Sequence, residues 1–135
     1  MLNKTLPIIS VAATVALLYY SWIPFAGTGG PEPPSGNPVH LIAFFAYSVV
    51  ILVTASRFTS TRKSAVAAFL LSVAVGAITE LGQLFIPGRF CDPADWLVDA
   101  AGTAVGIAVA LLVQYLLSKR AGNGKHIKHN NKVRQ

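Results

Sequence analysis

Four of the five acidic residues of this 135-residue chain fall in the stretch TELGQLFIPGRFCDPADWLVD, positions 79–99. Carboxylates can transfer protons, bind cations or cap helices, and the arginine in the same stretch has the forked donors that hold anions. Charged residues make up only 12% of the chain and hydrophobic residues 53%, so this concentration requires an explanation. The residues concerned are Glu80, Arg89, Asp92, Asp95 and Asp99.

Two of the aspartates have a structural explanation. Pro87-Gly88 breaks one predicted helix and Asp92-Pro93 begins the next, with Asp92 suited to the N-cap and Pro93 to the first helical position. Asp95 then falls three residues after the N-cap, where an acid complements the helix dipole and can complete a capping box. For both residues, capping and a functional role stay open.

Capping does not account for Asp99, which lies seven residues beyond Asp92. Glu80 lies seven residues before Pro87, so an antiparallel hairpin would place both carboxylates about 10 Å from the turn, at the same depth. Either carboxylate would be costly against lipid. We therefore expect both to face the interior of a helix bundle or a water-filled cleft.

Helical spacing places small and polar residues on one face of each arm of this hairpin. The first arm carries Gly76, Glu80 and Gln83, and the second carries Asp95, Asp99, Gly102 and Gly106. Two glycines four residues apart allow a neighbouring backbone to approach closely. His40, at the start of another apolar segment, is either an interfacial residue or a member of the same polar site.

The elements that must position these residues are long apolar runs. Each is close to the roughly 20 residues that a helix needs to cross a membrane. The four runs are Leu6–Ala26, Val39–Ser56, Ser64–Ile86 and Trp96–Ser118. They predict an all-α, polytopic membrane protein: a bundle of four transmembrane helices (6–26, 39–56, 64–86 and 96–118) in one domain, 1–118, followed by a basic tail, 119–135. A retained first helix is favoured over a cleaved signal peptide, whose apolar part is usually only about 7–15 residues.

The basic residues predict the orientation of the bundle. Ten of the eleven lysines and arginines precede the first run, join the second to the third or follow the fourth. By the positive-inside rule, a protein of the cell membrane with this pattern has cytoplasmic N- and C-termini, which leaves the acids and Arg89 on the outer side. We expect the tail to be disordered and drawn to anionic lipid headgroups, with no nucleic-acid partner. His126 and His129 have no ligand partners in the tail, and the spacing predicts no metal site and no cofactor.

The hairpin residues also carry a family resemblance. The pattern Glu80-x-x-Gln83, Pro87-Gly88-Arg89, Asp92, Asp95, Asp99, Gly102 and Gly106 is similar to the signature of VanZ-like membrane proteins. The histidine at position 40 resembles the family's other marker, and the similarity covers about residues 36–110. The family usually has asparagine in place of Asp99, and an Asp-Lys pair where this chain has Gly36-Asn37. The resemblance implies a protein of the cell envelope, under a family label of low-level resistance to the glycopeptide teicoplanin.

Three functions follow from these residues. The first is a module that binds or modifies the envelope at the outer surface, with membrane lipids and an envelope glycan or lipid-linked precursor as partners. The second is an enzyme on such a substrate, with Glu80 or Asp95 handling a proton while His40 and Arg89 hold an anionic group. The third, an ion pathway, is less favoured because the inner half of every helix is apolar.

The site itself is predicted as one pocket in the outer half of the bundle. Its members are His40, Glu80, Gln83, Arg89, Asp95 and Asp99, with Asp92 as a further binding candidate. We expect Arg89 to fold back from the loop towards Glu80 or Asp99. One arginine among several acids leaves surplus negative charge, which suggests either a shared proton or a bound cation.

Overall fold

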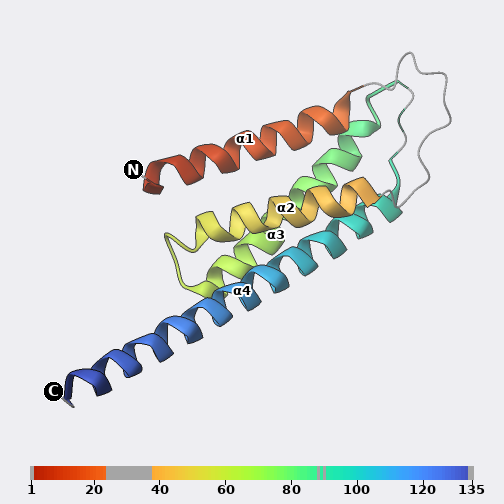
Figure 1. Cartoon of the computed structure of the whole chain (residues 1–135). Coiled ribbons are helices and arrows are strands. Elements are labelled where there is room, and N and C mark those ends of the chain that lie inside the picture. The colour runs from red at the N-terminus through yellow and green to blue at the C-terminus, as the bar shows by residue number, and fades with distance from the viewer. Residues whose placement is uncertain (1, 24–37, 88, 90, 134–135) are drawn as a thin grey trace.

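The computed structural model describes residues 2–23, 38–87, 89 and 91–133, which form four helices and no strand (Figure 1). Each helix is long and apolar enough to cross a membrane, so the predicted all-α class and the four transmembrane helices are confirmed. The helices are α1 (Leu2–Trp22), α2 (Pro38–Ala55), α3 (Thr61–Gln83) and α4 (Pro93–Val133).

The helices do not end where the apolar runs end. Helix α3 begins at Thr61 rather than Ser64, because the intervening Arg62 and Lys63 are good helix formers even though they are charged. Helix α1 begins at Leu2 and ends at Trp22, and the predicted extension to residue 26 lies outside the described residues. An apolar run therefore marks the part of a helix that can meet lipid, whereas the helix itself follows backbone hydrogen bonding.

Proline determines where α3 ends. The helix stops at Gln83, not at the predicted Ile86, because the ring of Pro87 would clash with the carbonyl four residues earlier. The next three residues continue in tight turns, and the N–H of Ile86 donates to the Gln83 carbonyl at 3.0 Å. This shortening matters for the site, since it changes which residues of α3 and α4 lie opposite each other.

Helix α4 differs most from the prediction. It begins at Pro93, as the capping residues predict, but it continues to Val133, through residues predicted to form a disordered tail. A helix that is already formed gains one hydrogen bond for each residue added at its end, so extension is easier than nucleation. Figure 1 shows α4 projecting well beyond the other three helices at its C-terminal end.

Helix α2 is at the centre of the bundle and contacts each of the other three helices. The buried apolar core consists of Phe44, Tyr47, Ile51 and Leu52 of α2, Ala68 and Val75 of α3, and Ile107 of α4. Large apolar side chains elsewhere point outward, among them Leu70 and Leu112, which are 61% and 56% exposed. Polar groups inside the bundle and apolar side chains on its exterior are the distribution that a surrounding membrane requires.

Helix α1 lies at one side of the bundle, against α2 and α3, and within the described residues it does not contact α4 (Figure 1). Hydroxyl groups join it to α2. Ser10 Oγ lies 2.7 Å from Thr54 Oγ1, and Thr14 Oγ1 lies 2.8 Å from the Tyr47 hydroxyl oxygen. Leu17 and Leu18 of α1 also pack against the core, so α1 is held by both polar and apolar side-chain contacts.

Candidate functional site

The start of α4 is capped by two residues from different helices. Asp92 Oδ1 accepts the N–H of Ala94 at 2.8 Å, so Asp92 is the N-cap. The N–H of Asp92 donates to Glu80 Oε2 of α3 at 3.0 Å. In a capping box, the N–H of the N-cap residue donates to the side chain of the residue three positions later, which here is Asp95. Glu80 takes this place from the neighbouring helix, a contact that spacing along the chain does not predict.

His40 and Asp99 join α2 to α4. His40 Nδ1 lies 3.0 Å from Asp99 Oδ1, and the Asp99 side chain is fully buried. Gly76 of α3 makes room for this carboxylate, because a β-carbon at Gly76 would lie 3.3 Å from Asp99 Oδ2. Three helices therefore enclose the Asp99 side chain.

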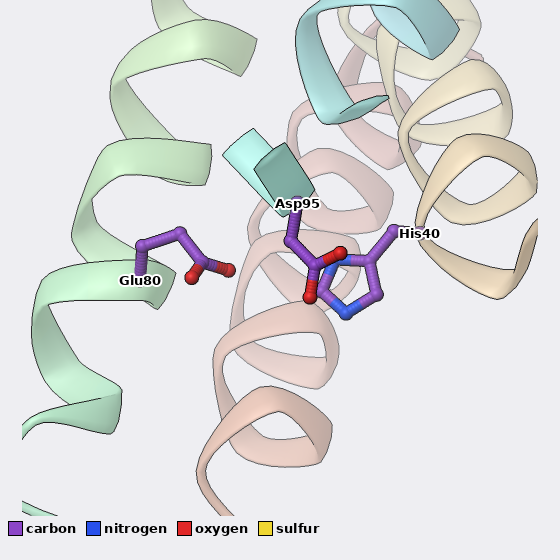
Figure 2. Close-up of side chains that lie close together, drawn as sticks. All are labelled: His40, Glu80 and Asp95. Atoms are coloured by element: carbon purple, nitrogen blue, oxygen red, sulfur yellow. The ribbon is translucent and has the colours of Figure 1, made fainter. Parts of the chain in front are cut away.

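His40, Glu80 and Asp95 form a cluster in which one ligand-type atom of each lies within 4.8 Å of the others. Figure 2 shows the Glu80 carboxylate extending from α3 towards Asp95, whose own carboxylate lies beside the imidazole of His40. Glu80 is buried, whereas His40 and Asp95 are half-buried, so the cluster can be reached from outside the protein. Three of the predicted site residues are thus brought together.

Two carboxylate oxygens of this site have no hydrogen-bond partner. Glu80 Oε1 and Asp99 Oδ2 are both buried and unpartnered, although the other oxygen of each group is hydrogen-bonded. A buried acceptor without a partner carries a desolvation cost of about 1–3 kcal/mol, and more if it is charged. The arrangement can lower this cost by holding a proton or a cation between the acids.

Glu80 and Asp99 do not lie at the same depth in the bundle, contrary to the expectation from the sequence. Glu80 lies opposite the start of α4, where it accepts the N–H of Asp92. Asp99 lies opposite Gly76, one helical turn farther from the α3–α4 connection. The offset is about 6 Å along the helix axis. It arises because α3 ends at Gln83 while α4 begins at Pro93, so the turn is not centred between them. Neither carboxylate faces lipid: Glu80 is 3% exposed and Asp99 0%.

Arg89 has a different partner from the one predicted. Its Nη2 donates to the carbonyl of Ile23, beyond the end of α1, at 3.4 Å. The oxygens of Glu80 and Asp99 either bond Asp92 and His40 or have no hydrogen-bond partner, so the expected contact with Arg89 is not formed. The guanidinium thus points towards the end of α1 and not towards the acids.

The remaining predicted residues hold the helices in position. Gln83 is buried one turn from Glu80 on the same face of α3. The backbone of α2 crosses α4 at its two glycines: a β-carbon at Gly102 would lie 3.1 Å from Leu41 Cα, and one at Gly106 would lie 3.1 Å from Phe45 Cα. Because Leu41 follows His40, the close approach at Gly102 also sets the distance between His40 and Asp99.

Sequence reasoning missed a second group of polar residues, deeper in the bundle. Ser48, Ser64, Ser72 and Thr103 are fully buried, so the inner half of the helices is not wholly apolar as predicted. Ser72 is four residues before Gly76 and Thr103 four after Asp99, and this spacing could have revealed both. The hydroxyls of Ser72 and Thr103 have no hydrogen-bond partner, so they do not form a continuous relay.

Trp96 was also missed as part of the site. Its Nε1 donates to the Val73 carbonyl at 3.1 Å, and its ring would lie 3.3 Å from a β-carbon at Gly76. The indole thus fixes the first turn of α4 against α3, beside the aspartates on either side of it in sequence.

Comparison with known proteins gives one match. The model of the VanZ/LLP1 family matches residues 4–114, which include α2, α3, most of α1, the first half of α4 and every residue of the site. A search of curated proteins and a search of solved structures found nothing similar. Since the match spans most of the chain, this four-helix membrane protein belongs to the VanZ/LLP1 family.

Proposed function

We propose that this protein acts on the cell envelope through a polar pocket at the extracytoplasmic end of its helix bundle. The observation that carries the proposal is the convergence of His40, Glu80 and Asp95 from three different helices. Ionisable groups inside a membrane bundle are costly to fold, and they usually mark a functional site. The family name VanZ, which is linked to teicoplanin resistance, supports an envelope role.

The distribution of charge supports the outward orientation of the pocket. Ten of the eleven lysines and arginines lie in the first turn of α1, in the α2–α3 link and the first turn of α3, or after the apolar part of α4. The pocket lies at the opposite end of the bundle, near the α3–α4 turn. With the basic segments in the cytoplasm, the pocket opens at the outer leaflet, where envelope precursors are used.

The charge of the pocket indicates which envelope groups it accepts. Three carboxylates surround one imidazole, so a bare phosphate would be repelled, whereas hydroxyl or amino donors and cations would be attracted. The glycan or peptide part of a lipid-linked precursor offers such donors. His40 is accordingly assigned to the acid cluster through its bond with Asp99, and the predicted anion-binding role for it is not retained.

Complementation of a deletion strain tests this function. Cells that lack the protein should become more sensitive to teicoplanin, and the wild-type chain should restore resistance. Glu80→Gln should not restore it, because the pocket loses a charge at the centre of the cluster. Asp92→Asn is the matched control: it also removes one nearby charge, but asparagine is an equally good N-cap. If Glu80→Gln restores resistance as fully as Asp92→Asn, the pocket is not the functional site.

An enzymatic role is the second candidate, and the unpartnered Glu80 Oε1 beside Asp95 and His40 favours it. Such an oxygen can accept a proton from a bound substrate without first breaking another hydrogen bond. Purified protein in lipid vesicles, incubated with lipid-linked cell-wall precursor, should then convert the precursor, and Asp95→Asn should abolish the conversion. Unchanged precursor after prolonged incubation with protein that still binds it favours the binding module.

A further inference from the structure

His40, Glu80 and Asp95 offer the ligand set of a divalent metal site. One imidazole nitrogen and two carboxylate groups have their ligand atoms within 4.8 Å of one another. In a tetrahedral site with bonds of about 2.1 Å, ligand atoms lie about 3.4 Å apart. The three residues come from three different helices, and their side chains face one another (Figure 2).

Glu80 supplies a second observation that points to a ligand. Its side chain is 3% exposed, and Oε1 has no hydrogen-bond partner although it is buried. Oε2 is held by the N–H of Asp92 at 3.0 Å, so the carboxylate is fixed with one oxygen left over. In Figure 2 the carboxylate points towards Asp95 and His40. A fixed carboxylate with one open oxygen is suited to binding a cation.

Asp99 contributes to this ligand set indirectly, through its hydrogen bond with His40. When His40 Nδ1 donates its proton to Asp99 Oδ1, at 3.0 Å, the imidazole keeps its lone pair on Nε2. Histidines that bind metals commonly donate their other N–H to a carboxylate in this way, which fixes the tautomer and makes the ligand nitrogen more basic. Asp99 is fully buried between α2, α3 and α4, so it orients the ring without contacting the metal.

From this geometry we infer that the protein binds one divalent first-row transition metal ion, such as Zn²⁺, through His40, Glu80 and Asp95, with Asp99 as a positioning residue. Imidazole favours zinc over magnesium and calcium, and two carboxylates offset the charge of the ion. With three protein ligands the fourth position is open, and a hydroxyl or amino group of an envelope component can occupy it. The inference rests on the proposed pocket but not on its role in the envelope.

Metal binding by purified protein tests the inference without any cellular readout. The chain carries His126→Ala and His129→Ala and no affinity tag, so that other histidines do not bind the probe. Titration calorimetry of Zn²⁺ in detergent should give one ion per chain, and Mg²⁺ should not compete at equal concentration. Glu80→Gln and Asp95→Asn should each weaken binding by about 100-fold or more, and Asp99→Asn by about 10–100-fold.

Asp92→Asn is the control for simple charge attraction, because it removes an acid beside the cluster but no ligand. It should bind Zn²⁺ as tightly as the wild type. The inference is overturned if folded wild-type protein takes up no Zn²⁺, or if Asp92→Asn weakens binding as much as Glu80→Gln does. Failure of metal binding with full complementation by the wild-type chain would refute the metal site and leave the proposed function standing.

Discussion

Helices α1 and α4 both pack against α2, but in different ways. Helix α4 packs through glycines, with the backbone of α2 in van der Waals contact at Gly102 and Gly106. Helix α1 is joined through side-chain contacts: hydroxyl pairs, the Trp22 indole, and Leu17 and Leu18 against the core. The site lies entirely on the α2, α3 and α4 side. The backbones thus approach closely at the interface that holds His40 against Asp99, whereas α1 is joined through side chains.

The largest expected difference in stability between the two interfaces comes from replacing one glycine in each by alanine, which adds one methyl group. Gly102→Ala places a β-carbon against the Leu41 backbone of α2, which cannot move without shifting the helix, and overpacking of this kind costs about 1–3 kcal/mol. Gly82→Ala meets the indole of Trp22 from α1, which must shift and weaken its 3.3 Å hydrogen bond to the Thr79 carbonyl. Both changes gain the same helix propensity, about 0.5–1 kcal/mol.

Thermal unfolding in detergent measures this contrast. Gly102→Ala should unfold at a clearly lower temperature than the wild type and lose activity in the complementation assay, whereas Gly82→Ala should be destabilised less and keep its activity, because only an indole of α1 has to move. Equal destabilisation by the two changes would show that the α1 interface is as closely packed as the α2–α4 interface.

The hydrogen bond between Glu80 and the start of α4 gives the next largest effect. Glu80→Ala removes the acceptor of the Asp92 N–H and should destabilise the protein by about 1–2 kcal/mol. Glu80→Gln keeps an acceptor and removes the buried charge, so its stability should be at or above that of the wild type. Chemical denaturation of the two variants separates the structural role of Glu80 from its functional role. Equal loss of stability in both would mean that the charge itself stabilises the fold.

Two tryptophans provide a matched test of the two interfaces. Trp96 of α4 donates to the Val73 carbonyl at 3.1 Å, and Trp22 of α1 donates to the Thr79 carbonyl at 3.3 Å. Phenylalanine in place of either removes one indole N–H donor. Trp96→Phe should cost about 1 kcal/mol, near the mean for such a bond. Trp22→Phe should cost less because its bond is longer and α1 can adjust, and the reverse order in unfolding experiments would contradict the comparison.

The smallest effect is expected for the hydroxyl pair between α1 and α2. Thr14 Oγ1 and the Tyr47 hydroxyl are 2.8 Å apart, and hydrogen bonds between membrane helices average only about 0.6 kcal/mol in double-mutant cycles. A cycle of Thr14→Val and Tyr47→Phe should give a coupling energy near that value. A coupling above about 2 kcal/mol would place α1 among the closely packed helices.

The sequence predicts the four helices, because runs of about 20 apolar residues have few other structures available to them. It also predicts which faces are buried, since Gly76, Glu80, Gln83 and Asp99 all lie inside the bundle. It could not predict the register of α3 against α4, which depends on where Pro87 ends the helix. A shift of one turn moved Asp95, not Asp99, opposite Glu80.

The partners of individual polar groups were also beyond sequence reasoning. The N–H of Asp92 had two candidate acceptors, one in its own helix and one in α3, and only the packing of the hairpin selects Glu80. Arg89 could reach several carboxylates by length alone, yet its described contact is the Ile23 carbonyl. Spacing along the sequence determines which face of a helix a residue occupies. Which residues that face contacts depends on the distance between the helices.

Cross-linking in native membranes tests most directly whether helices α2, α3 and α4 bring the acid cluster together. The single cysteine is first removed by Cys91→Ser. Paired cysteines at Glu80 with Asp95, and at His40 with Asp99, should be joined rapidly by a short thiol cross-linker. A pair at Glu80 with Leu97, whose side chain is 62% exposed on another face of α4, should not be joined. Equal cross-linking of all three pairs, or none at Glu80 with Asp95, would contradict the proposed site.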